Sequence, residues 1–82
     1  VARPGRARLR TLDAAAAFER GVSLREQGEY GAAMDAFRQA EQRDGPHVET
    51  QLRIAQAALD LGRNDTALEA AQRARQLLAR VR

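Results

Sequence analysis

Small and apolar residues recur at steps of three and four along most of this chain, which is the spacing of one face of an α-helix. The first run lies within residues 13–27 and the second within residues 30–43. Two further runs follow at residues 47–61 and at residues 64–81. The pattern predicts four amphipathic helices, so the expected fold class is all-α.

Glycine and proline mark the breaks between these runs. Gly28 and Gly62 each follow a helical run, and glycine turns the chain after a helix without a Cβ clash. The break at Gly45-Pro46 is stronger, because proline cannot continue a helix and disfavours helix in the residue before it. We therefore expect two stacked antiparallel hairpins, the first of which opens near Asp13.

An internal repeat relates the two predicted hairpins. The run from Gly28 to Ala40 returns in register from Gly62 to Ala74, an offset of 34 residues. Repeats of this length are typical of helical arrays, in which one hairpin cannot bury its own apolar face and neighbouring hairpins stack to cover it. The predicted domain spans residues 13–82, with a first repeat of about 14–47 and a second of about 48–81.

The first repeat resembles the tetratricopeptide repeat family. Its matching positions are Gly21, Leu24, Gly28, Tyr30, Ala33, Phe37 and Ala40. The second repeat is degenerate and matches at Ile54, Ala55, Gly62, Ala67 and Ala74. Departures include Ala17, where a large aromatic is usual, and Ala71, where phenylalanine is usual. Small residues are expected at Gly21 and Ala33 because two helix backbones pass close together there.

The resemblance implies a binding surface. In this family the first helix of each repeat lines a concave groove that holds an extended peptide or a partner helix. Carried onto this sequence, the groove residues are Phe18, Val22, Arg25, Glu49, Leu52, Arg53, Gln56 and Leu59. The family's carboxylate-clamping lysines have no counterpart, because the chain contains no lysine. An apolar or amphipathic segment with some negative charge is the better fit, unless Phe18 and Leu52 merely pack between helices.

The last predicted helix offers a second candidate surface. Repeat arrays normally need about three units and a polar capping helix. No such cap follows in this sequence, so we expect an uncovered interface made of Leu68, Ala71, Leu77 and Leu78. Exposed apolar strips of this kind usually mark an interaction site. The strip would serve self-association or contact with a neighbouring subunit or domain.

Charge is concentrated at the two ends of the chain. The net charge is +3, and the chain contains arginine but no lysine. Neither Val1–Arg10 nor Arg73–Arg82 contains an aspartate or glutamate. Residues 1–12 contain Pro4-Gly5 and no apolar period, so they are predicted to form a basic flexible arm. The arginine-rich ends allow an alternative function, binding of nucleic acid or an anionic surface, which would weaken steeply with salt. A structural spacer without its own partner is the third possibility.

No residue cluster indicates catalysis, a metal site or a cofactor site. The single histidine, His47, cannot build a metal site alone, no nucleophile with a matched base is apparent, and no phosphate-binding loop is present. Cysteine is absent, which is compatible with a reducing compartment such as the cytoplasm and does not establish one. No apolar run is long enough to span a membrane. The sequence predicts a non-catalytic protein-binding adaptor or scaffold, with a composition that resembles GC-rich bacterial proteins.

Overall fold

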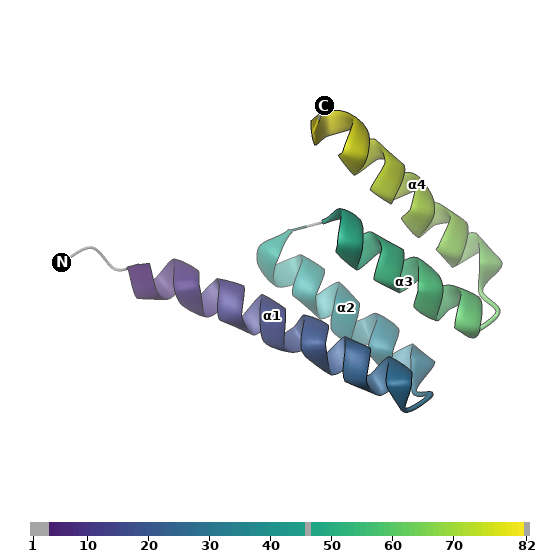
Figure 1. Cartoon of the computed structure of the whole chain (residues 1–82), viewed down its shortest axis with the longest axis horizontal. Helices are drawn as coiled ribbons and strands as arrows, with labels where there is room; N and C mark the ends of the chain where they lie inside the picture. The colour runs from purple at the N-terminus through teal and green to yellow at the C-terminus, as the bar shows by residue number, and fades with distance from the viewer. Residues whose placement is uncertain (1–3, 46, 82) are drawn as a thin grey trace.

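Four helices make up most of the described chain (Figure 1). The computed structural model describes residues 4–45 and 47–81, with side chains described for 13–45 and 47–80. The helices are α1 (Pro4–Glu26), α2 (Tyr30–Asp44), α3 (Val48–Asp60) and α4 (Asn64–Val81), and the described residues contain no strand. Helix α1 packs on α2, α2 on α3, and α3 on α4. The predicted all-α fold of two stacked hairpins is confirmed.

The first hairpin turns on a glycine with a positive φ angle. Gly28 has a φ of 82°. The amide of Glu29 donates to the carbonyl of Leu24 at 2.8 Å, and the amide of Gly28 donates to the carbonyl of Arg25 at 3.0 Å. These two bonds form a Schellman motif, which pairs carbonyls that the end of α1 would otherwise leave without a donor.

The second hairpin repeats this turn. Gly62 has a φ of 76°. The amide of Arg63 donates to the carbonyl of Ala58 at 2.8 Å, and the amide of Gly62 donates to that of Leu59 at 2.9 Å. Each donor and acceptor lies 34 residues after its counterpart in the first turn. The sequence repeat is therefore also a repeat of backbone hydrogen bonds.

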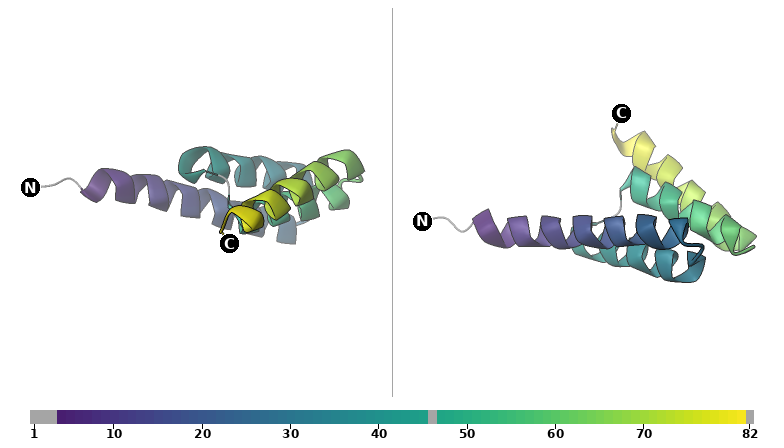
Figure 2. Two further views of the ribbon diagram at one scale, coloured as in Figure 1. Left: turned by 90° about the horizontal axis from the view of Figure 1, so that it is seen from above. Right: turned by 60° about the horizontal axis from the view of Figure 1, so that its bottom comes forward.

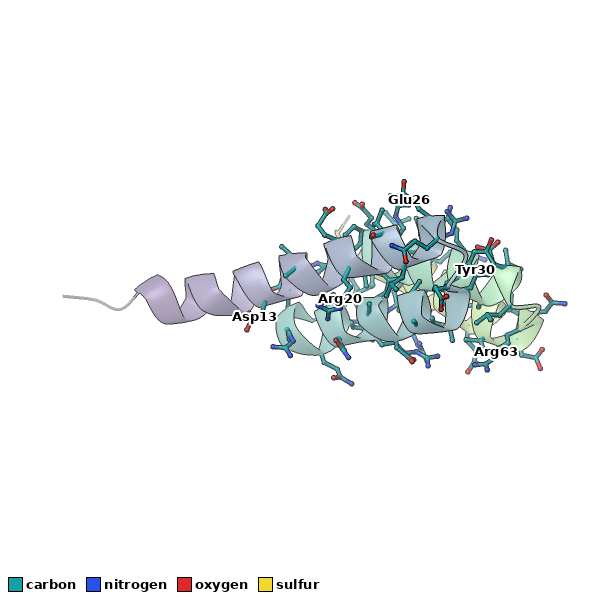
Figure 3. All side chains as sticks on the ribbon, turned by 90° about the horizontal axis from the view of Figure 1, so that it is seen from below. Asp13, Arg20, Glu26, Tyr30 and Arg63 are labelled. Carbon is teal, nitrogen blue, oxygen red and sulfur yellow. The ribbon has the colours of Figure 1, made fainter. Side chains whose placement is uncertain are left out.

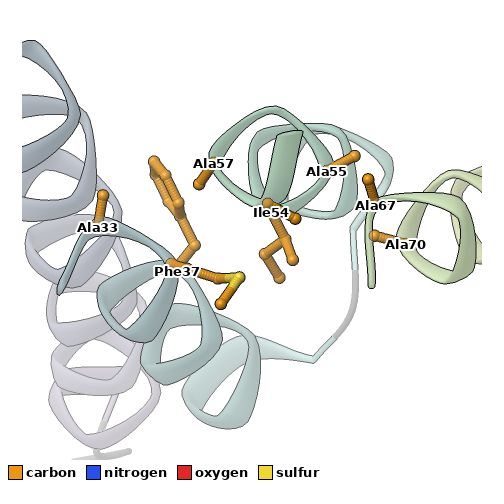
Figure 4. Close-up of a cluster of buried hydrophobic side chains, with 9 residues drawn as sticks. Ala33, Phe37, Ile54, Ala55, Ala57, Ala67 and Ala70 are labelled. Atoms are coloured by element: carbon orange, nitrogen blue, oxygen red, sulfur yellow. The ribbon is translucent and has the colours of Figure 1, made fainter. Parts of the chain in front are cut away.

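The core depends on three large apolar side chains. Phe37, Met34 and Ile54 are almost fully buried, and they lie among alanines where the two hairpins meet (Figure 4). A Cβ atom built on Gly21 would lie 2.6 Å from Cε1 of Phe37. The sequence placed Gly21 at a close approach of two backbones, but the neighbour that requires a glycine there is the Phe37 ring.

The first helix begins earlier than the sequence predicted. Helix α1 starts at Pro4, whereas the sequence pattern gave a flexible arm over residues 1–12. Proline suits the first helical position, because its fixed φ is helical and its missing N–H would be unpaired there. The alanine, arginine and leucine residues that follow are strong helix formers. The arm prediction is therefore wrong for residues 4–12, and residues 1–3 lie outside the described residues.

The molecule is thin. Its Cα atoms extend over 49 × 34 × 14 Å, so the shortest extent is less than half of the next one. Figure 2 shows the two hairpins from two further directions, with the start of α1 well separated from the end of α4. Because the layer is this thin, every helix that contributes to the core also keeps a face in solvent.

Candidate functional site

Helices α1 and α3 meet through side chains of the candidate groove. Nε of Arg25 donates to Oδ2 of Asp60 at 3.0 Å, which joins the end of α1 to the end of α3. The guanidinium carbon of Arg53 lies 5.8 Å from the centroid of the Phe18 ring. That ring packs on Phe37 of α2, with centroids 5.4 Å apart and planes tilted by 60°. The first helices of both repeats therefore contribute to one surface.

Four of the groove candidates lie along one stripe of α3. At about 100° per residue, Glu49, Leu52, Gln56 and Leu59 fall on one face of that helix. Leu52 is 48% exposed and Leu59 is 59% exposed, although both are large and apolar. The amide of Gln56 is exposed between the two leucines. The stripe can therefore offer apolar contacts together with one hydrogen-bonding amide.

The groove candidates on α1 are less open. Phe18 and Val22 are half-buried and pack against the core cluster. The sequence left open whether Phe18 and Leu52 face a groove or pack between helices. In the structure Phe18 is partly packed on Phe37, whereas about half of Leu52 is in solvent. The more accessible apolar part of the surface is thus on α3.

A pocket opens where α1 passes the start of α3. Its volume is about 280 Å³. The lining residues are Ala14, Ala15, Phe18, Ala40, Asp44, His47, Glu49 and Thr50. On its rim, Nε2 of His47 lies 3.2 Å from Oδ2 of Asp44. The volume is at the lower limit of small-molecule sites, roughly 300–1,000 Å³, so the pocket suits a single side chain of a bound segment.

The two arginines of the groove already have acidic neighbours. Arg25 is bonded to Asp60, and Nη2 of Arg53 lies 4.0 Å from Oε1 of Glu49. Exposed ion pairs of this kind contribute roughly 0–1 kcal/mol. They therefore orient side chains more than they stabilise the fold. Sequence reasoning missed the first pair, because its members are 35 residues apart and on different helices.

Polar bonds hold the outer side of the first hairpin. Nη2 of Arg20 donates to Oε1 of Gln39 at 2.8 Å. Nη1 of Arg43 donates to Oδ2 of Asp13 at 3.2 Å. Figure 3 shows Asp13 and Arg20 along α1, on the side where it runs beside α2. Polar side chains therefore border the contact between α1 and α2, in contrast to the largely apolar stripe on α3.

The four apolar residues predicted to be uncovered on α4 do not share one strip. Leu68 is 59% exposed, Leu78 is 53% exposed and Ala71 is half-buried. These three lie on one flank of the buried stripe of α4. Leu77 is half-buried and lies about 100° from Leu78, on the opposite flank. The uncovered strip therefore consists of Leu68, Ala71 and Leu78, and Leu77 lies outside it.

The described parts of the two arginine-rich ends lie on separate helices, α1 and α4. Arg73, Arg75 and Arg80 are exposed along α4. The start of α1 lies far from the end of α4 (Figures 1 and 2). Within residues 4–45 and 47–81, no group of three or more His, Cys, Asp or Glu could hold a metal ion. In the same part of the chain, no helix has the length and apolarity needed to cross a membrane.

A scan against protein-family models matches residues 24–82 to the model described as Tetratricopeptide repeat. The matched segment begins in the last turn of α1 and includes both glycine turns and helices α2 to α4. This match confirms the resemblance found in the sequence. A search of curated proteins and a search of solved structures each found no match.

Proposed function

This chain belongs to the tetratricopeptide repeat family, and from that premise we propose that it binds a segment of a partner protein along the α1–α3 groove. Repeats of this family generally mediate protein–protein interaction, and the family is typically a non-catalytic scaffold. The observation that carries the proposal is the exposure of Leu52 and Leu59 on one stripe of α3. We propose a binding role without catalysis.

The bound segment contacts the groove in three ways. Leu52 and Leu59 bury apolar side chains of the partner, each worth about 1.5–3 kcal/mol if fully removed from water. The exposed amide of Gln56 lies between them and pairs with the backbone of an extended segment. One side chain of the partner enters the pocket beside Phe18. Large apolar anchors flanked by polar groups are the usual source of affinity in such contacts.

Charge plays a smaller part in this proposal. Arg25 is engaged by Asp60, so the end of the groove is close to neutral. Arg53 is the better partner for a negative group, because its guanidinium packs on Phe18 and its nearest acid, Glu49, is 4.0 Å away. We therefore propose an apolar or amphipathic segment with a carboxylate placed beside Arg53, as the sequence also indicates.

The test begins with the whole chain and a random peptide library displayed on phage. The tightest selected peptide is titrated calorimetrically into the chain and into two variants. Leu59→Glu puts a charge in the groove, and Leu68→Glu makes the same change on α4 at a leucine that is also 59% exposed. We expect Leu59→Glu to weaken binding by about tenfold or more, as loss of a hot-spot contact does, and Leu68→Glu to leave it unchanged. Selection of no peptide, or equal affinities, would refute the groove.

The competing function uses the exposed arginines of α4. Arg73, Arg75 and Arg80 carry no acid between them in the sequence. Binding of nucleic acid or an anionic surface through these residues releases counterions, so its affinity falls steeply with salt. Titration of double-stranded and single-stranded DNA at several salt concentrations separates this function from groove binding, which responds only mildly to salt.

A further inference from the structure

Helix α4 exposes the face that α2 uses to hold α3. Because the two hairpins repeat in register, each residue of α2 has a counterpart 34 positions later in α4. The counterpart pairs on this face are Met34 and Leu68, Phe37 and Ala71, and Glu41 and Arg75. Met34 is 2% exposed in the core cluster, whereas Leu68 is 59% exposed. This face of α4 is therefore not covered by another helix of the described residues.

Helix α3 shows what kind of helix such a face holds. Thr50, Ile54 and Ala57 are all buried, and they follow one another at i, i+4 and i+7. Figure 4 shows Ile54 and Ala57 on the side of α3 toward α2, and Ala55 on the side toward α4. A helix that covers α4 in the same way needs an apolar stripe with this spacing.

A second copy of this chain does not provide that stripe by head-to-tail stacking. Stacking would place α1 of one copy on α4 of the other, as α3 lies on α2. The residues of α1 in register with Thr50, Ile54 and Ala57 are Ala16, Arg20 and Ser23, all of them exposed. Arg20, which is bonded to Gln39, would replace an isoleucine on a face that already carries Arg75. Like charges brought together in this way oppose association.

Charge and side-chain size on α4 define a different occupant. No acid follows Glu69 in the sequence, and the exposed Arg75 lies on this face, so the face carries a positive charge in the second half of α4; Arg73 and Arg80 lie on the opposite side of the helix. In the second hairpin the counterpart of Gly21 is Ala55, and the counterpart of Phe37 is Ala71. Ala71 lacks the bulk of a phenylalanine and is only half-buried, so it leaves room for contact with a large apolar side chain of a partner.

We propose that the α4 face, made of Leu68, Ala71, Arg75 and Leu78, docks an acidic amphipathic helix of a partner protein. The apolar stripe of that helix packs against Leu68 and Leu78, and one large apolar side chain lies over Ala71. Its carboxylates lie beside Arg75, where they pair with the guanidinium. This surface is separate from the α1–α3 groove and extends the proposed function to a second binding face.

Two synthetic peptides of about 18 residues, a length that holds helix in water when alanine-rich, serve as the probes. Both carry leucines along one face. One has glutamates on the flanks of that face, and the other has lysines at the same positions. Each is titrated into the isotope-labelled whole chain, and the backbone amide resonances are followed by NMR. Variants Leu68→Glu, Arg75→Glu and Leu59→Glu are titrated in the same way, with circular dichroism to confirm that each is folded.

We expect the glutamate peptide to shift amides of α4 and to bind about tenfold more tightly than the lysine peptide, as opposite charges favour complementary partners. Leu68→Glu abolishes this binding, Arg75→Glu reverses the preference between the peptides, and Leu59→Glu changes neither. Equal binding of both peptides, shifts confined to α1 and α3, or no binding would overturn the proposal. A dimer in sedimentation equilibrium that Leu68→Glu dissociates would also overturn it, in favour of a second copy. Because Leu59→Glu and Leu68→Glu act on different faces, this test and that of the groove fail separately.

Discussion

Replacing Gly21 with alanine adds one methyl group where α1 meets the Phe37 ring. Its Cβ would lie 2.6 Å from Cε1, 2.7 Å from Cδ1 and 2.9 Å from Cζ of that ring. The ring has no exposed surface, so it has little freedom to move away. Overpacking of this kind costs about 1–3 kcal/mol, whereas exchanging glycine for alanine within a helix gains about 1 kcal/mol. We therefore expect Gly21→Ala to lower the free energy of unfolding by about 0–2 kcal/mol.

Gly31 provides a matched control for this substitution. It lies in α2, its φ is not positive, and an added Cβ would meet nothing within 4 Å. Gly31→Ala should raise the free energy of unfolding by up to about 1 kcal/mol through helix propensity alone. The two identical exchanges should thus differ by about 1–3 kcal/mol, the overpacking cost. Urea unfolding followed by far-UV circular dichroism measures both, provided that the m-values agree.

A double-mutant cycle identifies the ring as the cause. In a Phe37→Leu background the clashing ring atoms are absent, so Gly21→Ala should lose most of its cost. The expected coupling energy between positions 21 and 37 is about 1 kcal/mol or more, as for residues in direct contact. If Gly21→Ala stabilised the protein as much as Gly31→Ala, or if the coupling were zero, the ring would not lie against Gly21. The account of the α1–α2 contact would then be wrong.

Three further stability predictions use the same unfolding assay. Phe37→Ala should cost about 3–5 kcal/mol, because it removes the largest fully buried side chain; a change below the cost of a surface substitution would show that the ring is not in the core. Gly28→Ala and Gly62→Ala should each cost about 1–2 kcal/mol, because their φ angles of 82° and 76° strain any residue with a Cβ; clearly unequal costs would contradict the shared turn geometry. Gln51→Met should raise stability by about 1–3 kcal/mol, because Gln51 is fully buried and neither atom of its side-chain amide has a hydrogen-bond partner among the described residues; a loss would show that the amide is paired in solution.

Local backbone chemistry made much of the fold predictable. Gly28 and Gly62 end helices because of their own conformational freedom, so the sequence located both turns, and the boundaries at the hairpin turns differ from the prediction by at most one residue. The start of α1 was not predicted, because no local signal in the sequence marked it. The prediction placed the start of the first hairpin near Asp13, whereas the helix begins at Pro4 and passes through a stretch without an apolar period. An amphipathic pattern marks a helix face that is packed, and it gives no signal where a helix extends past its partner.

The contacts of the candidate site were harder to predict from the sequence, because they join residues that are far apart in the chain. The pairing of Arg25 with Asp60 and the packing of Arg53 on Phe18 depend on how α1 and α3 lie relative to one another. Helical periodicity fixes which residues share a face of one helix, and it does not fix what a neighbouring helix brings to that face. The position of Leu77 on the other flank of α4 could have been predicted from the sequence, because consecutive residues of a helix lie about 100° apart and this separates Leu77 from Leu78.

The distribution of alanine explains how a short helix can pack on two neighbours and still expose large apolar side chains. Helix α3 has only 13 residues, yet it packs on α2 through Ile54 and Ala57, packs on α4 through Ala55, and exposes Leu52 and Leu59. One helix can do this only if its buried positions are small enough for neighbours to approach on two sides. Each buried alanine removes little apolar area from water, so the stabilisation concentrates in the few large core side chains. Exposed positions such as Leu59 and Leu68 can therefore change with little effect on folding, so substitutions there test the two proposed faces without unfolding the chain.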